Sequence, residues 1–150
     1  MKTFAEKAYR YTKLDFVETQ RRINEMLQDI NITSIRYTQE NDFYTVEFLV
    51  KLYENEGQRK VRINIPCDEE FGGNEKKNAN RKNQLFRVLL YNLKNRFVSV
   101  ANGLKEFDEE FLSDLVIMHE GKEVRVGDII APKYRELLGS GQSVPVLHIN

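Results

Sequence analysis

The chain has 150 residues, of which 41% are hydrophobic and 31% charged, as in an ordinary folded domain. Its 23 basic and 23 acidic residues cancel, which argues against a general nucleic-acid-binding domain, because such domains are normally basic overall. The single cysteine, Cys67, cannot form an internal disulfide, and no uncharged apolar run approaches transmembrane length. We therefore expect one cytoplasmic domain spanning residues 1–150, with no membrane partner.

The N-terminal part of the chain predicts a short strand followed by a helix. Tyr9 and Tyr11 alternate with polar residues, which is typical of an edge strand over Tyr9–Thr12. Asp15 followed by Glu18 is a typical helix N-cap with its N3 partner. Apolar residues then recur at helical spacing and predict an amphipathic helix over roughly 16–30. They are Phe16, Ile23, Met26, Leu27 and Ile30.

The next stretch predicts an antiparallel meander of three strands, over 32–38, 43–53 and 60–65. The second strand carries the clearest alternation of the chain, with Thr45, Glu47 and Lys51 on one face and, on the other, Tyr44, Val46, Phe48, Val50 and Leu52. In the third strand Lys60, Arg62 and Asn64 alternate with Val61, Ile63 and Ile65, and Pro66 ends the strand. Such a meander has one apolar and one polar face.

A polar loop is expected over 67–79, followed by a long helix over about 80–102. The helix carries an apolar face and ends at the cap Asn102-Gly103. Leu85, Val88 and Val98 widen this face beyond what one sheet covers, which predicts a homo-oligomer. The core-facing residues are Phe86, Leu89, Leu90, Leu93, Phe97 and Val100.

The C-terminal half reads as mainly helical. An acidic helix places Phe107, Phe111 and Leu115 on one face. Residues 116–118 and 123–126 predict a hairpin around a turn at 119–122, and Pro132 suits the first position of a last helix that Gly139 terminates. The tail 143–150 is apolar enough to pack or to pair as a strand. The predicted fold is α+β: a small antiparallel β-sheet packed by a long helix, with a helical C-terminal half. Within it, residues 1–66 form the helix and meander, and 80–150 the helical half.

Several local motifs resemble a family of small uncharacterised proteins encoded by phages and prophages. The motifs are Leu85-Phe86-Arg87-Val88-Leu89-Leu90, Leu93-Lys94-Asn95-Arg96, Gly103, Glu109-Glu110-Phe111-Leu112, and the segment from Gly139 to Leu147. Family members often have Trp where this chain has Phe86, and they usually have a shorter second hairpin. The resemblance implies a viral setting and the cytoplasm of the host cell. It implies no activity and no functional residues.

The charges of the chain are sharply segregated. Residues 76–105, here called the basic run, hold eight bases and no acid, whereas residues 106–114, the acidic segment, hold five acids and no base. Two interpretations stay open. Either the basic run binds an anionic ligand, or it packs against the acidic segment across the turn at Gly103.

The ligand interpretation places the site on one stripe of the long helix. Gln84, Arg87, Tyr91 and Lys94 lie three or four residues apart, so that they share one helix face. In this hypothesis Arg87, Lys94 and Arg96 bind phosphates, Tyr91 stacks on a base, and Asn92 or Gln84 recognises polar edges. Arg62, on the polar face of the third strand, would extend the patch.

No catalytic motif is found, and no metal or cofactor is predicted. The cluster Asp108-Glu109-Glu110 with Asp114 suits the start of a helix better than a metal site, because neighbouring acids on one turn point in different directions. The sequence therefore predicts a non-enzymatic binding protein for a small anionic ligand such as a nucleotide. The most concrete version is a protein that sequesters a nucleotide immune signal of the host. The alternatives are a single-stranded nucleic-acid-binding accessory protein of phage replication or recombination, and a protein inhibitor of a host defence enzyme.

Overall fold

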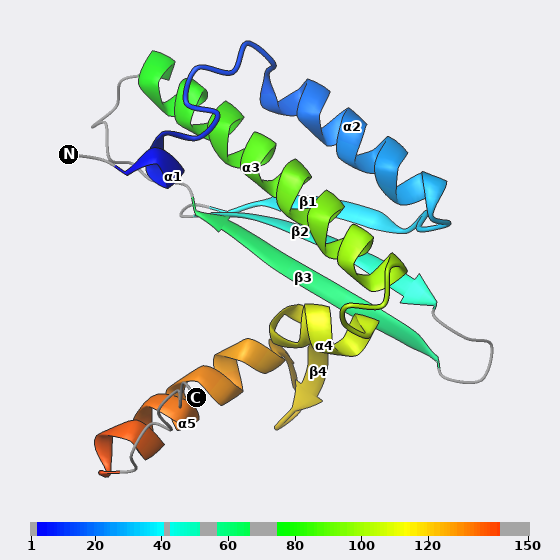
Figure 1. Cartoon of the computed structure of the whole chain (residues 1–150), viewed down its shortest axis with the longest axis vertical. Helices are drawn as coiled ribbons and strands as arrows, with labels where there is room; N and C mark the ends of the chain where they lie inside the picture. Colours follow the sequence, from blue (N-terminus) through cyan, green and yellow to red (C-terminus); the bar gives the residue numbers. More distant parts are fainter. Residues whose placement is uncertain (1–2, 41–42, 52–56, 67–74, 142–150) are drawn as a thin grey trace, which may run out of the picture.

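The structure is a computed structural model that describes residues 3–40, 43–51, 57–66 and 75–141. The fold is α+β, as the sequence predicts, with a long helix packed on a small antiparallel sheet (Figure 1). In chain order the elements are α1 (Phe4–Lys7), α2 (Phe16–Asp29), β1 (Ile35–Gln39), β2 (Phe43–Lys51), β3 (Gln58–Pro66), α3 (Glu75–Ala101), α4 (Phe107–Phe111), the 3₁₀ helix η1 (Leu112–Asp114), β4 (Val116–His119), β5 (Lys122–Arg125) and α5 (Val126–Gly139).

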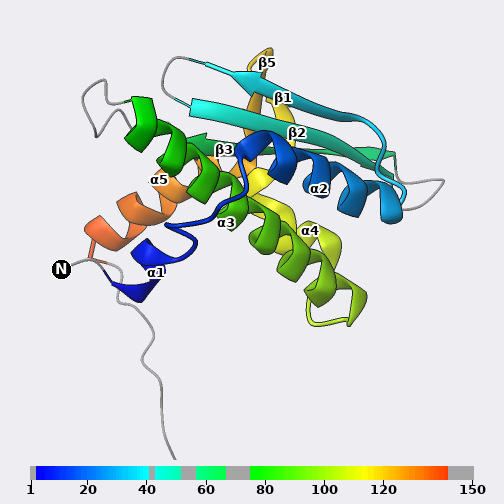
Figure 2. The ribbon, with the colours of Figure 1, turned by 90° about the horizontal axis from the view of Figure 1, so that it is seen from above.

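Strands β1, β2 and β3 form an antiparallel sheet in chain order, which confirms the predicted meander. Phe48 on β2 lies opposite Ile35 on β1 and Val61 on β3, so the apolar positions of the three strands share one face. Helices α2 and α3 both cover this face of the sheet (Figure 2). Leu52, predicted for the same face, lies outside the described residues.

The core between the helices and the sheet is built largely from aromatic rings. Phe86 of α3 is fully buried, and its ring centroid lies 5.6 Å from those of Phe16 and Tyr44. Further along α3, the ring of Phe97 lies 6.2 Å from that of Phe48 on β2 and 5.0 Å from that of Phe111 on α4. Because ring pairs at such separations add to the free energy of area burial, these contacts fix α3 against the sheet along its length.

Helix α3 begins at Glu75, inside the segment predicted as a polar loop, so that prediction is wrong for residues 75–79. These residues contain neither Pro nor Gly, and nothing in them opposes a helix, although the apolar periodicity begins only at Leu85. Residues 67–74 lie outside the described part of the chain. At its other end, Gly103 has a φ of 76° and the Leu104 N–H donates to the Ser99 carbonyl at 3.0 Å. This Schellman motif is the predicted cap.

The outer face of the sheet, opposite the helices, carries a cluster of acidic and basic side chains that form ion pairs with one another. Glu47 of β2 accepts hydrogen bonds from Arg36 at 2.5 Å and from Arg62 at 3.0 Å, its cross-strand neighbours on β1 and β3. Lys60 and Arg62 also pair with Glu123 of β5, at 3.0 and 2.9 Å. The predicted polar face is therefore present, but its central carboxylate is buried beneath the side chains that join the β4–β5 hairpin to the sheet.

The predicted acidic helix and hairpin are confirmed. Phe107, Phe111 and Leu115 are buried in the core. Strands β4 and β5 pair antiparallel, and Glu120 and Gly121 between them have φ values of 52° and 79°. Two consecutive positive φ values are typical of the type I′ turns that match the twist of a hairpin.

Helix α5 begins at Val126, so the prediction that Pro132 opens it is wrong. The backbone passes from β5 into the helix directly at Arg125, without a loop. Pro132 lies inside the helix, where its fixed φ suits the helical backbone but its missing N–H leaves out one hydrogen bond. Gly139 is the last helical residue rather than the terminator, and the positive φ of 89° is at Gly141. The tail 143–150, expected to pack or to pair as a strand, lies outside the described residues.

Residues 3–15, here called the N-terminal arm, do not form the predicted edge strand. Thr3 and Glu6 form a capping box that opens the one-turn helix α1. Tyr9 then adopts a φ of 59°, which no strand residue has. The arm crosses α3 on the side away from the sheet (Figure 2). It ends at Asp15, which accepts the Glu18 N–H at 2.8 Å and caps α2 as predicted.

Candidate functional site

Among the described residues, the basic run and the acidic segment meet at the C-terminal end of α3. Arg96 pairs with Asp114 at 2.7 Å and with Glu110 at 3.6 Å, and its guanidinium lies 4.0 Å from the centre of the Phe111 ring. Lys105 lies 4.0 Å from Glu110. In the described part of the chain, no other base of the run pairs with the acidic segment. Packing against the acidic segment therefore accounts for this end of α3, whereas the described bases of its N-terminal half do not contact that segment.

The acids of the acidic segment do not converge on one point. Asp108 pairs with Arg59 of β3 at 3.0 Å, whereas Asp114 contacts Arg96 and also Arg125 of β5 at 2.6 Å. Asp108 thus joins α4 to β3, whereas Asp114 joins η1 to α3 and β5. No group of side chains suited to holding a metal ion is found among the described residues.

Three of the predicted ligand residues, Gln84, Arg87 and Tyr91, lie on one stripe of α3, but the arm covers this stripe. The ring of Tyr91 stacks on Tyr9, with centroids 5.0 Å apart and planes 13° apart. Arg87 donates from Nη2 to the Tyr91 hydroxyl at 3.1 Å. Its other terminal nitrogen, Nη1, is buried and has no hydrogen-bond partner among the described residues. The Tyr91 ring is therefore stacked on a residue of the chain itself.

The other predicted ligand residues do not join this group. Arg62 belongs to the cluster on the outer face of the sheet, where it contacts Glu47 and Glu123. Arg96 is paired with Asp114, as described above. Asn92 and Lys94 are exposed on α3, beyond the part of the helix that the arm crosses.

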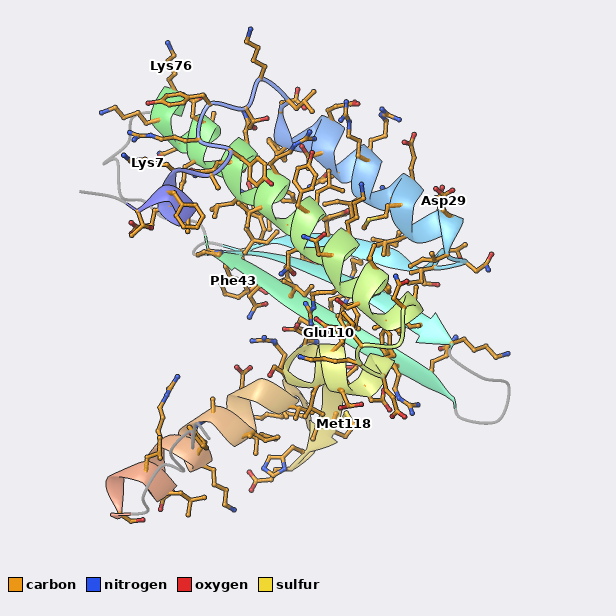
Figure 3. All side chains as sticks on the ribbon, in the orientation of Figure 1. Lys7, Asp29, Phe43, Lys76, Glu110 and Met118 are labelled. Atoms are coloured by element: carbon orange, nitrogen blue, oxygen red, sulfur yellow. The ribbon has the colours of Figure 1, made fainter. Side chains whose placement is uncertain are left out.

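A hollow of about 190 Å³ lies between the arm and the N-terminal half of α3. It is lined by Glu6, Arg10, Tyr11, Lys77, Asn80, Arg81 and Gln84. Three of these side chains are cationic and one is acidic. Further lysines lie at the same end of the molecule, as the labelled side chains of Lys7 and Lys76 in Figure 3 show. The electrostatic surroundings of the hollow therefore favour an anion.

Gln84 holds both walls of the hollow in place. Its side chain is buried, and its amide nitrogen donates to the carbonyls of Glu6 at 3.0 Å and Ala8 at 2.8 Å. Its amide oxygen accepts a hydrogen bond from Nη1 of Arg81 at 3.0 Å. The sequence suggests that Gln84 recognises polar groups of a ligand. In the structure its amide group instead binds the backbone of the arm and orients Arg81.

The arm contributes a cation and an aromatic ring to the hollow. The Arg10 guanidinium lies 5.5 Å from the centre of the Tyr11 ring, and Tyr11 is 86% exposed. Sequence reasoning missed both residues, because the alternation of Tyr9 and Tyr11 was interpreted as a strand. The available signal was the Thr3-x-x-Glu6 capping box, which predicts a helical turn directly before this segment and so favours a turn-rich arm over an extended strand.

A larger hollow of about 310 Å³ lies beside the cluster on the outer face of the sheet. Its charged lining residues are Arg36, Glu47 and Lys60, and both bases form ion pairs with Glu47. Burial raises the pKa of the Glu47 carboxyl, but hydrogen bonds from Arg36, Arg62 and Lys60 outweigh it, so the net pKa lies below the usual value. These ion pairs stabilise the fold. Because the bases here already pair with Glu47, this hollow favours an anionic ligand less than the hollow beside the arm does.

Comparison of the chain with protein-family models, curated proteins and solved structures finds no match. Among the described residues, no helix is long and apolar enough to span a membrane. The function is therefore argued from the site itself.

Proposed function

We propose that this chain is a non-enzymatic binding protein that captures a phosphate-bearing ligand, such as a nucleotide, in the hollow between the arm and α3. The observation that carries the proposal is that Arg10, Lys77 and Arg81 line one hollow beside the exposed ring of Tyr11. Guanidinium and ammonium groups form charge-assisted hydrogen bonds with phosphate oxygens, and an exposed ring can stack on a base.

The size of the hollow supports a compact anionic group as the buried part of the ligand. Pockets that enclose a whole small molecule measure roughly 300–1,000 Å³, whereas this hollow measures about 190 Å³. A phosphate group and its neighbouring atoms therefore enter the hollow, while a sugar or base extends along the surface towards Tyr11.

Capture without conversion is the role of a sponge, a protein that lowers the concentration of a signal by binding it. The phage resemblance of the sequence suggests the concrete case, in which the protein sequesters a nucleotide immune signal in the host cytoplasm and blunts host defence.

A homo-oligomer belongs to the same proposal. Val88 and Val98 are 40% and 50% exposed on α3, whereas Leu85 packs against the core, so the first two remain for a contact between copies.

A second candidate is binding of single-stranded nucleic acid by the same surface. It is favoured by the small size of the hollow and by exposed Lys76 at the start of α3, which suit successive phosphates of one strand. The two candidates differ in their response to salt. Affinity for a strand falls steeply with salt, because each neutralised phosphate releases counterions, and it rises with strand length.

The test begins with the purified protein, heated to release any bound molecule for mass spectrometry. Isothermal titration then follows with ATP, cyclic dinucleotides, ADP-ribose, inorganic phosphate and a 12-nucleotide oligo(dT). We expect Arg10→Ala to weaken binding of a nucleotide at least about tenfold, since one charge-assisted hydrogen bond is worth about 1.5–3 kcal/mol. Lys133→Ala, on exposed α5, is the control and should bind as the wild type does. Equal affinities of the wild type and Arg10→Ala, or no binding of any probe, would contradict the proposal.

A further inference from the structure

We infer that the N-terminal arm is a clamp that closes on the ligand, and that the stack of Tyr9 on Tyr91 is its latch. This inference rests on the proposed function, because the arm forms one wall of the proposed binding hollow. Neither Tyr9 nor Tyr91 lines the hollow. They are positioning residues, which act on the ligand through Arg10 and Tyr11.

The arm lies on α3 without burying any of its own residues. None of its residues 3–15 is buried, and Phe4 at its start is 90% exposed. Its contacts with α3 include the ring stack of Tyr9 on Tyr91 and the two hydrogen bonds from Gln84 to its backbone. Segments with so little buried apolar surface open at a small fraction of the global free energy of unfolding. The arm is therefore able to undock while the core stays folded.

The backbone conformation of Tyr9 depends in part on a contact that the arm makes only when it is docked. Its φ of 59° lies in the left-handed region, which an aromatic residue adopts only at a cost. Such a conformation persists only where surrounding contacts stabilise it. Two contacts do so: the Thr12 N–H donates to the Tyr9 carbonyl at 3.1 Å, within the arm, and the Tyr9 ring stacks on Tyr91. The stack is the contact that joins Tyr9 to α3, and the ring has no other ring partner among the described residues.

The latch fixes where the ligand-binding side chains lie. Arg10 and Tyr11 directly follow Tyr9, so the position of the stacked ring decides how they reach the hollow. On the opposite wall, Gln84 orients Arg81 through a hydrogen bond of 3.0 Å. A ligand that touches both walls binds only the docked arm. By linkage it stabilises the docked state, and an arm that is partly undocked raises the apparent Kd by the inverse of the docked fraction.

The first test measures the latch without any ligand, by hydrogen exchange of the arm with mass spectrometry. The N–H groups of Lys7, Ala8, Arg10 and Thr12 are hydrogen-bonded within the arm and report on its order. We expect Tyr9→Ala to speed exchange in residues 3–12 and to leave the core unchanged. Tyr9→Phe keeps the ring and should exchange as the wild type does. Equal exchange of Tyr9→Ala and the wild type would overturn the latch, whatever the protein binds.

The second test uses ATP as the probe. Tyr9→Ala should raise the Kd for ATP by about two- to tenfold, the range expected for the loss of one stacked ring pair, and Tyr9→Phe should restore it. ATP should also slow exchange of the arm in the wild-type protein. If Arg10→Ala abolishes ATP binding while Tyr9→Ala leaves it unchanged, the clamp is refuted and the proposed function stands. If ATP gives the wild-type arm no protection, the clamp is refuted as well.

Discussion

Replacing Asp114 with Asn should destabilise the protein strongly, because this carboxylate joins three parts of the fold. Its Oδ2 accepts from Nη2 of Arg96 on α3 at 2.7 Å, and its Oδ1 accepts from Nη2 of Arg125 at the end of β5 at 2.6 Å. The three side chains are only 12%, 14% and 20% exposed. The substitution keeps the shape of the side chain and removes the charge between two guanidinium groups.

The expected cost follows from what the two arginines keep. Removing one partner of a buried ion pair costs about 3–5 kcal/mol when the other charge is left uncompensated. Here Arg96 keeps the Glu110 carbonyl at 3.0 Å, and Arg125 keeps the Arg62 carbonyl at 3.1 Å. We therefore expect a loss of about 2–3 kcal/mol in the free energy of unfolding, or about 4–12 °C in Tm for a chain of this size.

Urea unfolding followed by circular dichroism measures this loss, with thermal unfolding as a second readout. Asp128→Asn is a matched control, because Asp128 pairs with the same Arg125 at 3.3 Å but is 61% exposed. An exposed pair is worth less than about 1 kcal/mol. If Asp114→Asn cost no more than Asp128→Asn, Asp114 would not be the junction of the fold that its contacts indicate.

Three further predictions concern single contacts. Because the pKa of Glu47 is lowered in the folded protein, its stabilising effect is present above its ordinary pKa of 4.5 and is lost as the pH falls through the lower folded value. Glu47→Gln should remove that part of the acid dependence in urea titrations from pH 6 to pH 2.5; an unchanged profile would show that other groups carry it. Gly127→Ala should cost about 1–3 kcal/mol, since a Cβ there would lie 2.8 Å from the Ser113 carbonyl oxygen, and a neutral result in thermal unfolding would mean that α5 shifts easily. Gly103→Ala should cost about 1 kcal/mol, because the cap of α3 needs a φ of 76°, and urea unfolding that shows no loss would argue against this cap.

Periodicity predicted the elements that pack against the core. The alternation in β2 predicted which face carries Phe48, and Phe107, Phe111 and Leu115 reached the core as their helical spacing indicated. These predictions succeeded because burial of one face dominates the choice of structure in such segments. The arm lacks a buried face, so the alternation of its two tyrosines carried no information about pairing.

The candidate site was predicted only in part, because the residues that line it come from two segments far apart in the sequence. The sequence located a basic helix, and it left open whether its charges meet a ligand or the acidic segment. The structure shows that Arg96 meets the acidic segment, whereas Arg81 lines a hollow with residues of the arm. No local pattern indicates that Arg10, far earlier in the chain, lies across α3. The arm is held there by the buried amide of Gln84, which the helical spacing assigns instead to a ligand-binding stripe.

The measurement that tests the proposed site most directly is an ATP titration of ¹⁵N-labelled protein followed by NMR. The proposal predicts that the largest chemical-shift changes fall within residues 6–11 and 77–84, the two segments that contain the lining residues of the hollow. Arg10→Ala should require at least about tenfold more ATP to produce the same changes. Changes centred on Arg36, Glu47 and Lys60 would place an anion on the outer face of the sheet instead, and changes along Lys94 alone would return the site to the uncovered part of α3. Either result would contradict the binding hollow proposed for this chain.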